Sequence, residues 1–222
     1  MLDINATIQA IAVFILPLLF AITLHEAAHA YAARYFGDLT AWQMGRVSLN
    51  PLRHIDPIGT VFIPFASMLF SNGAFLFGYA KPTPINFDSL RHPKSDMFWV
   101  AVAGPFANLV MAFFWAALLK LAWFLPMNDF TLPLTEMSKA GITINCVLML
   151  INLLPVPPLD GGRMVVSLLP HKLAWRFAQI ERWSFLVFLV LLYFLYTGIF
   201  GAVMDPLVSS AARAIESIFG LY

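Results

Sequence analysis

Five long apolar stretches dominate the chain, and each approaches or exceeds the ~20 residues that an α-helix needs to cross a lipid bilayer. Lys, Arg, Asp and Glu together make up only 11% of its 222 residues, whereas about a quarter of the residues of a soluble domain are charged. The sequence therefore predicts an all-α polytopic membrane protein and excludes a soluble globule, a disordered chain and a coiled coil. The five stretches are residues 4–36, 57–80, 98–124, 141–158 and 184–204.

The connections between these stretches are short and polar. We therefore expect a single domain over residues 1–222, with a core at 4–165 and C-terminal helices at 166–222. Residues 171–183 and 206–222 mix apolar and charged side chains, as helices lying at a membrane interface do. A formal net charge of +1 gives no electrostatic support to a nucleic-acid partner, and the sequence does not indicate an oligomeric state.

The second apolar stretch is interrupted by Pro64 and by the turn-forming residues 71–73. Such an interruption favours a re-entrant hairpin, because unwound backbone is tolerated at membrane depth only where protein shields it. With a hairpin, ten of the thirteen Lys and Arg residues share one face of the membrane, as the positive-inside rule expects. We therefore expect four crossings with both termini outside the cytoplasm, and a fifth crossing at 57–80 is the alternative.

Residues 25–29 (HEAAH) bring two histidines and a glutamate into the end of the first apolar stretch. On a helix, residues four positions apart share a face, so His25 and His29 can bind one metal ion. Glu26 lies beside them, where it can act as general base on a metal-bound water. Polar side chains are costly inside a membrane unless they pair or coordinate. A metal site is therefore the first interpretation, and a hydrogen-bonded polar cluster or a proton relay is the alternative.

A catalytic zinc ion usually has three protein ligands, and Asp160 is the strongest candidate for the third. It follows a run with three prolines, at residues 155–158, and it precedes two glycines. Proline cannot continue a helix, and unwound backbone at membrane depth is typical of a shielded or polar site. An ordinary helix-ending loop is the alternative, and the ligand types alone leave Co²⁺ and Fe²⁺ open beside Zn²⁺.

These motifs together resemble the site-2 protease family of intramembrane zinc metalloproteases, in its compact bacterial and archaeal form without PDZ or CBS domains. Residues 25–29 resemble the family's metal motif, and residues 152–162 (NLLPVPPLDGG) resemble its second motif. Residues 103–108 (AGPFAN) and 78–86 (GYAKPTPIN) resemble two segments that lie between them in the family. The resemblance covers about residues 20–165.

The resemblance implies one zinc ion per chain, with His25, His29 and Asp160 as its ligands and Glu26 as the general base. It also implies a zinc site within the membrane, towards the cytoplasmic side, in a bacterial plasma membrane.

Two asparagines are further candidates for the site. The resemblance implies that Asn152 binds the substrate or stabilises the oxyanion, and Asn108 is a candidate for substrate binding.

Two segments near the first helix have less specific patterns. Residues 39–50 alternate in polarity around Gly45, which indicates a short strand that could pair with extended substrate. A plain surface hairpin is the alternative for this segment. We interpret His54 and Asp56 as an interfacial anchor, with an approach to the metal or a gate for water as the alternatives.

The predicted function is that of an intramembrane zinc endopeptidase, which hydrolyses peptide bonds in or near transmembrane segments in regulated intramembrane proteolysis. Its partners are then the transmembrane segments of substrate proteins and the lipid bilayer. Two other functions stay open: a catalytically silent relative that binds and escorts membrane proteins, and a transporter or proton pathway that uses the buried His and Asp cluster.

Overall fold

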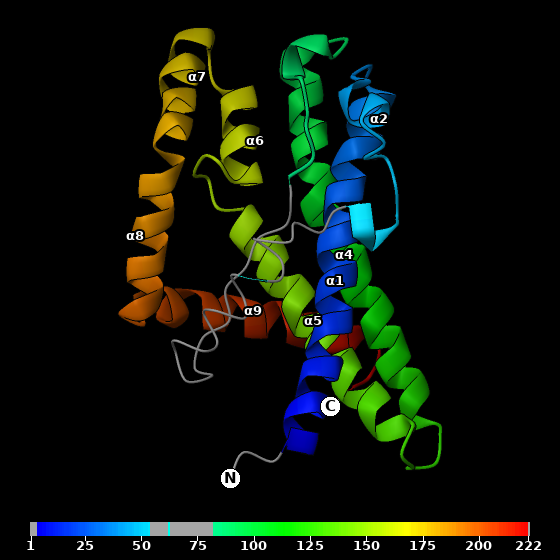
Figure 1. The fold of residues 1–222 in the computed structure, drawn as a ribbon. Helices are drawn as coiled ribbons and strands as arrows, with labels where there is room; N and C mark the ends of the chain where they lie inside the picture. Colours follow the sequence, from blue (N-terminus) through cyan, green and yellow to red (C-terminus); the bar gives the residue numbers. More distant parts are fainter. Residues whose placement is uncertain (1–3, 54–61, 63–81, 222) are drawn as a thin grey trace.

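The computed structural model describes residues 4–53, 62 and 82–221, and every regular element in this part of the chain is a helix (Figure 1). Among the described residues, four helical segments are long and apolar enough to cross a membrane, which confirms the expected all-α polytopic membrane protein. These segments are Val13–Tyr35, Pro93–Trp123, Thr131–Asn152 and His171–Phe194.

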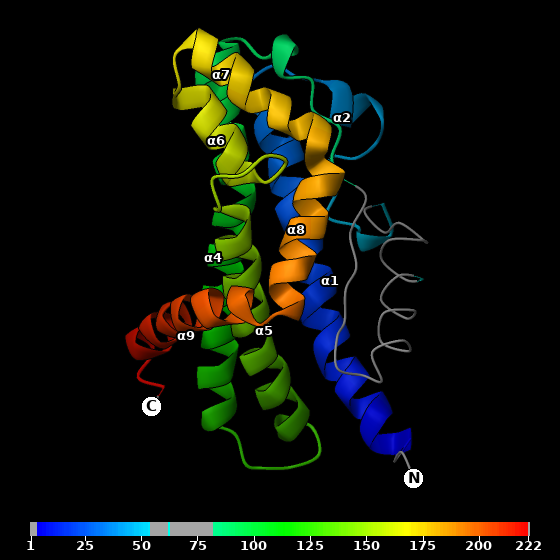
Figure 2. The same ribbon diagram turned by 90° about the vertical axis from the view of Figure 1, so that its left-hand side faces the viewer.

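Three helices form the bundle that carries the candidate site: α1 (Ile4–Tyr35), α4 (Pro93–Trp123) and α5 (Thr131–Asn152). They run alternately up and down, so α1 and α4 are antiparallel, as the expected four crossings require (Figures 1 and 2). Buried alanines in all three helices, including Ala112 and Ala116 of α4, let the backbones approach closely.

Helix α5 begins ten residues before the predicted stretch 141–158. The Thr131 hydroxyl accepts a hydrogen bond from the Asn128 N–H, and the Asn128 side chain accepts one from the Thr131 N–H. These two bonds satisfy backbone donors at the start of the helix and stabilise a first turn that hydropathy alone does not indicate. The helix ends at Asn152, just ahead of the prolines.

A tight turn follows α5 and leads into α6 (Asp160–Leu168). A Cβ atom added at Gly161 would lie 2.3 Å from the Leu153 carbonyl oxygen, and one added at Gly162 would lie 2.3 Å from the Pro157 nitrogen. Only glycine therefore fits where the first turn of α6 packs on the proline turn. This close packing fixes the position of Asp160, the first residue of α6.

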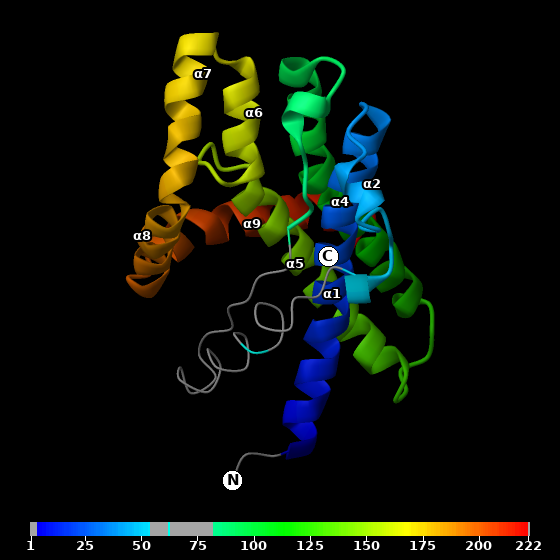
Figure 3. The ribbon, with the colours of Figure 1, turned by 45° about the horizontal axis from the view of Figure 1, so that its top comes forward.

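Helices α7 (His171–Ala178), η4 (Gln179–Trp183) and α8 (Ser184–Tyr196) follow one another without a break. Figures 1 and 3 show them as one column, with α6 beside its upper part. Residues 171–183 were expected to lie along the interface, but they extend α8 instead. None of the most apolar part of His171–Phe194 is buried, which is typical of a helix surrounded by lipid.

The predicted stretch 184–204 also ends early, because Gly198 adopts the left-handed φ of +77° and redirects the chain. Helix α9 (Ile199–Ile218) then lies across the bundle (Figures 1 and 2). Its buried residues, Met204 and Ile215, lie on a stripe with Val208 and Ala211, which pack on the core of the bundle. The first turn of α1 and the last turn of α9 both lie in the half of the bundle away from α7 (Figure 1), which agrees with four crossings.

The predicted strand at 39–50 is wrong. Helix α2 (Thr40–Gln43) begins there, stabilised by the Asp38 carboxylate, which accepts hydrogen bonds from the N–H and the hydroxyl of Thr40. Gly45 then makes a turn with a φ of +66°. The alternating pattern therefore reflects a short helical turn followed by a bend. The predicted hairpin at 57–80, apart from Phe62, lies outside the described residues, as do His54 and Asp56.

Candidate metal centre

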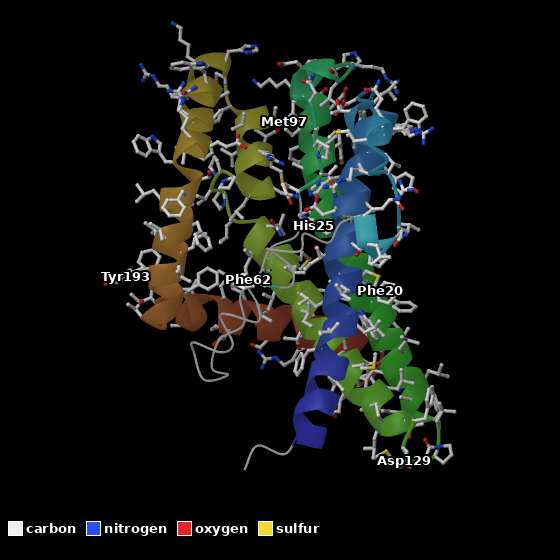
Figure 4. The ribbon with its side chains drawn as sticks, viewed as in Figure 1. Phe20, His25, Phe62, Met97, Asp129 and Tyr193 are labelled. Carbon is white, nitrogen blue, oxygen red and sulfur yellow. The ribbon has the colours of Figure 1, made fainter. Side chains whose placement is uncertain are left out.

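His25 and His29 lie one helical turn apart on the face of α1 that meets α4. Figure 4 labels His25 in the upper half of α1. Their side chains are buried, with only 8% and 4% of their surface exposed, and their Nε2 atoms lie 3.1 Å apart. The helical spacing predicted from the sequence therefore brings two imidazole nitrogens to one point.

Asp160 completes a triangle of ligand atoms, although it is 131 residues from His29 in the chain. Its Oδ2 atom lies 3.2 Å from the Nε2 atom of His25 and 3.2 Å from that of His29. Asp160 is 5% exposed and belongs to the first turn of α6, where the helix dipole favours a carboxylate. The proline turn and its two glycines hold it there.

The Nδ1 atoms of both histidines face acceptors. His29 Nδ1 lies 2.7 Å from the Val100 carbonyl oxygen, and His25 Nδ1 lies 2.6 Å from Asn108 Oδ1. Because these Nδ1 atoms must donate, each imidazole in its neutral form carries its lone pair on Nε2. Two such lone pairs and a carboxylate oxygen then converge at about 3 Å, and a cation between them would relieve their repulsion.

The spacing of the triangle fits zinc. For zinc–ligand bonds of about 2.0–2.1 Å in tetrahedral geometry, neighbouring ligand atoms are roughly 3.3 Å apart, and the observed separations are 3.1 Å and 3.2 Å. Two neutral imidazoles and one carboxylate are a donor set that catalytic zinc sites use, with the fourth position open. The second ring nitrogen of each histidine is oriented by a hydrogen bond, as is usual for metal ligands.

Gly104 of α4 makes room for this centre. A Cβ atom added there would lie 2.4 Å from His29 Nε2 and 2.7 Å from His25 Nε2, closer than any real contact. The missing side chain thus lets α4 approach the two histidines directly. Gly104 and Asn108 are four residues apart, so they face α1 together, as His25 and His29 face α4.

Glu26 lies next to the triangle on α1 and contacts the segment that precedes η3 (Phe87–Ser89). Its Oε2 atom accepts a hydrogen bond of 2.7 Å from the N–H of Thr83, and its carbonyl oxygen accepts one of 3.0 Å from the Thr83 hydroxyl. Glu26 is half-buried, and the hydrogen bond from the Thr83 N–H fixes the orientation of its carboxylate. This residue pair joins two of the motifs singled out from the sequence, at 25–29 and 78–86.

The two candidate asparagines lie in different surroundings. Asn108 is fully buried behind His25, with 0% of its surface exposed, and its Oδ1 atom faces His25 Nδ1. Asn152 is half-buried at the end of α5, and its Nδ2 donates to the Leu148 carbonyl oxygen at 3.0 Å.

Three residues near the centre were not predicted from the sequence to take part in it: Thr83, Gly104 and Asn145. Asn145 carried the clearest signal, because it is a polar residue in an apolar stretch and lies two turns before Asn152. Gly104 lay in a segment that was noted, but a close approach of two helices is not visible in a sequence. Thr83 also lay in a segment that was noted, 78–86, but nothing in the sequence indicated its contact with Glu26.

Comparisons with known proteins point to a zinc metalloprotease. The chain matches the sequence profile of peptidase family M50 over residues 13–138 and 130–195. It is 37% identical over 208 residues to the "Putative zinc metalloprotease YwhC" of Bacillus subtilis, covering 92% of this chain and 90% of that one. It is 30% identical over 186 residues to the "Putative zinc metalloprotease Rip2" of Mycolicibacterium smegmatis, covering 82% and 68% of the two chains. No solved structure matches the chain.

Proposed function

This chain belongs to peptidase family M50, the site-2 proteases, and is an integral membrane zinc metalloprotease; from this premise we propose that it cuts peptide bonds within the bilayer. The proposed substrates are membrane proteins, which are cleaved in or near their transmembrane segments. The ligands of the zinc ion are His25, His29 and Asp160, and Glu26 is the general base.

The observation that carries the proposal is the depth of the triangle of ligand atoms. His29 lies six residues before the last residue of α1, which is roughly 9 Å at the rise of an α-helix. His25 lies one turn deeper, within the segment Val13–Tyr35 that is long enough to cross a membrane. A peptide bond that reaches this centre must therefore enter the membrane region.

The mechanism follows from the residues around the centre. Zinc bound there would act as a Lewis acid on the water and on the scissile carbonyl. Glu26 removes a proton from the attacking water and returns it to the leaving amine. Asn152 is our candidate donor to the developing oxyanion, for which its Nδ2 would exchange its bond to Leu148. Asn108 is assigned to the orientation of His25, because no part of it is exposed.

The basic residues support an orientation with the centre towards the cytoplasm of a bacterial plasma membrane. The end of the bundle nearest His29 carries more cationic side chains than the opposite end, as the positive-inside rule expects of the cytoplasmic face. Basic residues in or next to the helix ends there are Arg34, Arg91, Lys94, Lys172 and Arg176. Both termini then lie outside the cytoplasm.

The substitution Glu26→Gln tests the proposed base. It preserves the size of the side chain and leaves the three ligands intact, so we expect one zinc ion per chain as in the wild type. Cleavage of a panel of single-span membrane peptides in liposomes should fall by about 10²–10⁴-fold, the usual contribution of a general base. Equal cleavage rates of the two proteins, both loaded with zinc, would remove Glu26 from the mechanism.

The contact with Thr83 gives a second prediction, which concerns how Glu26 is held. Thr83→Pro removes the N–H that bonds the carboxylate, and we expect kcat to fall about tenfold to a hundredfold, as for a lost hydrogen bond to a charged group. Thr83→Ala keeps this N–H and loses only the hydroxyl, so its kcat should fall less than about tenfold. KM and zinc content should not change in either variant. Equal losses of kcat in the two variants would show that the N–H does not position Glu26.

A further inference from the structure

Two asparagine side chains lie fully buried between α1, α4 and α5. Asn108 of α4 and Asn145 of α5 are both 0% exposed, and neither belongs to the triangle of zinc ligands. Buried amides are costly unless their hydrogen bonds are satisfied. Each of these amides has partners for both its oxygen and its nitrogen, and together they form a chain that ends at His25.

The chain starts at the backbone of α5. Asn145 Nδ2 donates to the Gly141 carbonyl oxygen at 2.8 Å, which leaves Asn145 Oδ1 to face α4. Asn108 Nδ2 donates to this Oδ1 at 3.0 Å and to the Ala21 carbonyl oxygen at 3.2 Å. Because a carbonyl oxygen can only accept, Gly141 fixes the direction of the Asn145 amide, and Asn145 in turn helps to fix that of Asn108.

The direction of the Asn108 amide decides which nitrogen of His25 carries the proton. With Nδ2 held by its two acceptors, Asn108 Oδ1 faces His25 Nδ1, 2.6 Å away, and this Nδ1 must donate. A reversed amide would turn its NH₂ group to Nδ1, and the proton would move to Nε2. His25 Nε2 would then have no lone pair for the metal.

The two histidine ligands differ in this respect. His29 Nδ1 donates to the Val100 backbone carbonyl, which has no second orientation. His25 is oriented by a side-chain amide, which has two. The bonds of Asn108 to Ala21 and to Asn145 are what select one of them.

From this chain of bonds we propose that Asn145 is a positioning residue of the metal centre: through Asn108 it holds His25 in the form that presents an Nε2 lone pair. The inference rests on the proposed ligand set. It adds Asn145, which lies 120 positions after His25 in the chain, to the residues that support these ligands. Outer partners of metal ligands typically contribute about 10–100-fold to metal affinity.

The test measures the dissociation constant of Zn²⁺ for the full chain in detergent, by competition with a chromophoric chelator. Asn145→Leu preserves the volume of the side chain and removes both polar atoms, so zinc should bind roughly 10–100-fold more weakly. Asn145→Asp should restore affinity to within a few-fold of the wild type. When protonated, its carboxyl accepts from Asn108 with one oxygen and donates to Gly141 with the other.

Ser138→Ala is the matched control. Ser138 is also buried on α5, and its hydroxyl donates only to the Leu134 carbonyl oxygen of the same helix. This variant should bind zinc as the wild type does. If Asn145→Leu fails to fold, as judged by thermal unfolding of the metal-free protein, Asn145→Ala takes its place in the same comparison.

His25→Ala separates the inference from the proposed ligand set. If His25→Ala retains full zinc affinity, the ligand set itself is wrong. If His25→Ala loses zinc while Asn145→Leu binds it as the wild type does, the ligand set stands and the role of Asn145 is overturned. If Asn145→Asp binds zinc as weakly as Asn145→Leu does, the role of Asn145 is also overturned. The loss of zinc affinity would then come from altered packing and not from the lost hydrogen bonds.

Discussion

Replacing Asp160 by alanine should leave the protein without zinc after purification and without proteolytic activity. Asp160 supplies the only carboxylate of the triangle among the described residues, 3.2 Å from both imidazoles. Its loss leaves two neutral nitrogens, which hold a divalent cation poorly in a dry site. The expected loss of affinity exceeds the about 10–100-fold that is typical of an outer partner, and elemental analysis measures it directly.

Asp96→Ala is a suitable control for this experiment. Asp96 is also 5% exposed and also lies in the first turn of a helix, where its carboxylate accepts from the His92 N–H. Its removal should lower stability without removing zinc. One zinc ion per chain in Asp160→Ala would contradict the ligand assignment.

Gly104→Ala is expected to have a comparable effect from the opposite helix. The new methyl carbon would lie 2.4 Å from His29 Nε2, so it occupies the space that the ligand atoms need. The substitution favours a helix by about 1 kcal/mol, so helix propensity cannot explain a loss. We expect zinc binding and cleavage to disappear, together with the rise in Tm that zinc gives the wild type.

Gly201→Ala makes the same change where there is room for it. The nearest atom to a Cβ at Gly201 is Asp205 Oδ2, at 3.4 Å, which is an ordinary contact. Its zinc content and cleavage rate should match those of the wild type. A Gly104→Ala protein that still binds one zinc ion tightly would mean that α4 does not approach the histidines as closely as described.

The membrane architecture could largely be predicted from the sequence, because it follows from hydropathy. Errors arose where side chains or a single backbone angle outweighed hydropathy. The bonds between Asn128 and Thr131 start α5 early, and Gly198 turns the chain before the apolar stretch ends. At 39–50 an alternating pattern was taken for a strand, although the hydrogen bonds from Thr40 to the Asp38 carboxylate favour the helical turn of α2.

The convergence of the three proposed ligands could be predicted for a different reason. His25 and His29 are related by helical spacing, and Asp160 follows an interruption that has no ordinary place inside a membrane. What supports them was less visible, because Thr83, Gly104 and Asn145 act through tertiary contacts between segments far apart in the chain. A sequence indicates that a polar residue lies in an apolar helix, but its hydrogen-bond partner is known only once the packing of the helices is known.

The most direct test of the central claim compares new peptide termini in native membranes that hold either the wild-type chain or Glu26→Gln. Mass spectrometry of these membranes would map each terminus onto the sequences of the membrane proteins present. We predict termini inside apolar segments that occur with the wild type and disappear with Glu26→Gln, while both proteins hold one zinc ion per chain. Termini that are identical in the two membranes, with substrates present and zinc bound, would contradict proteolysis by this centre and favour a protein that binds membrane segments without cutting them.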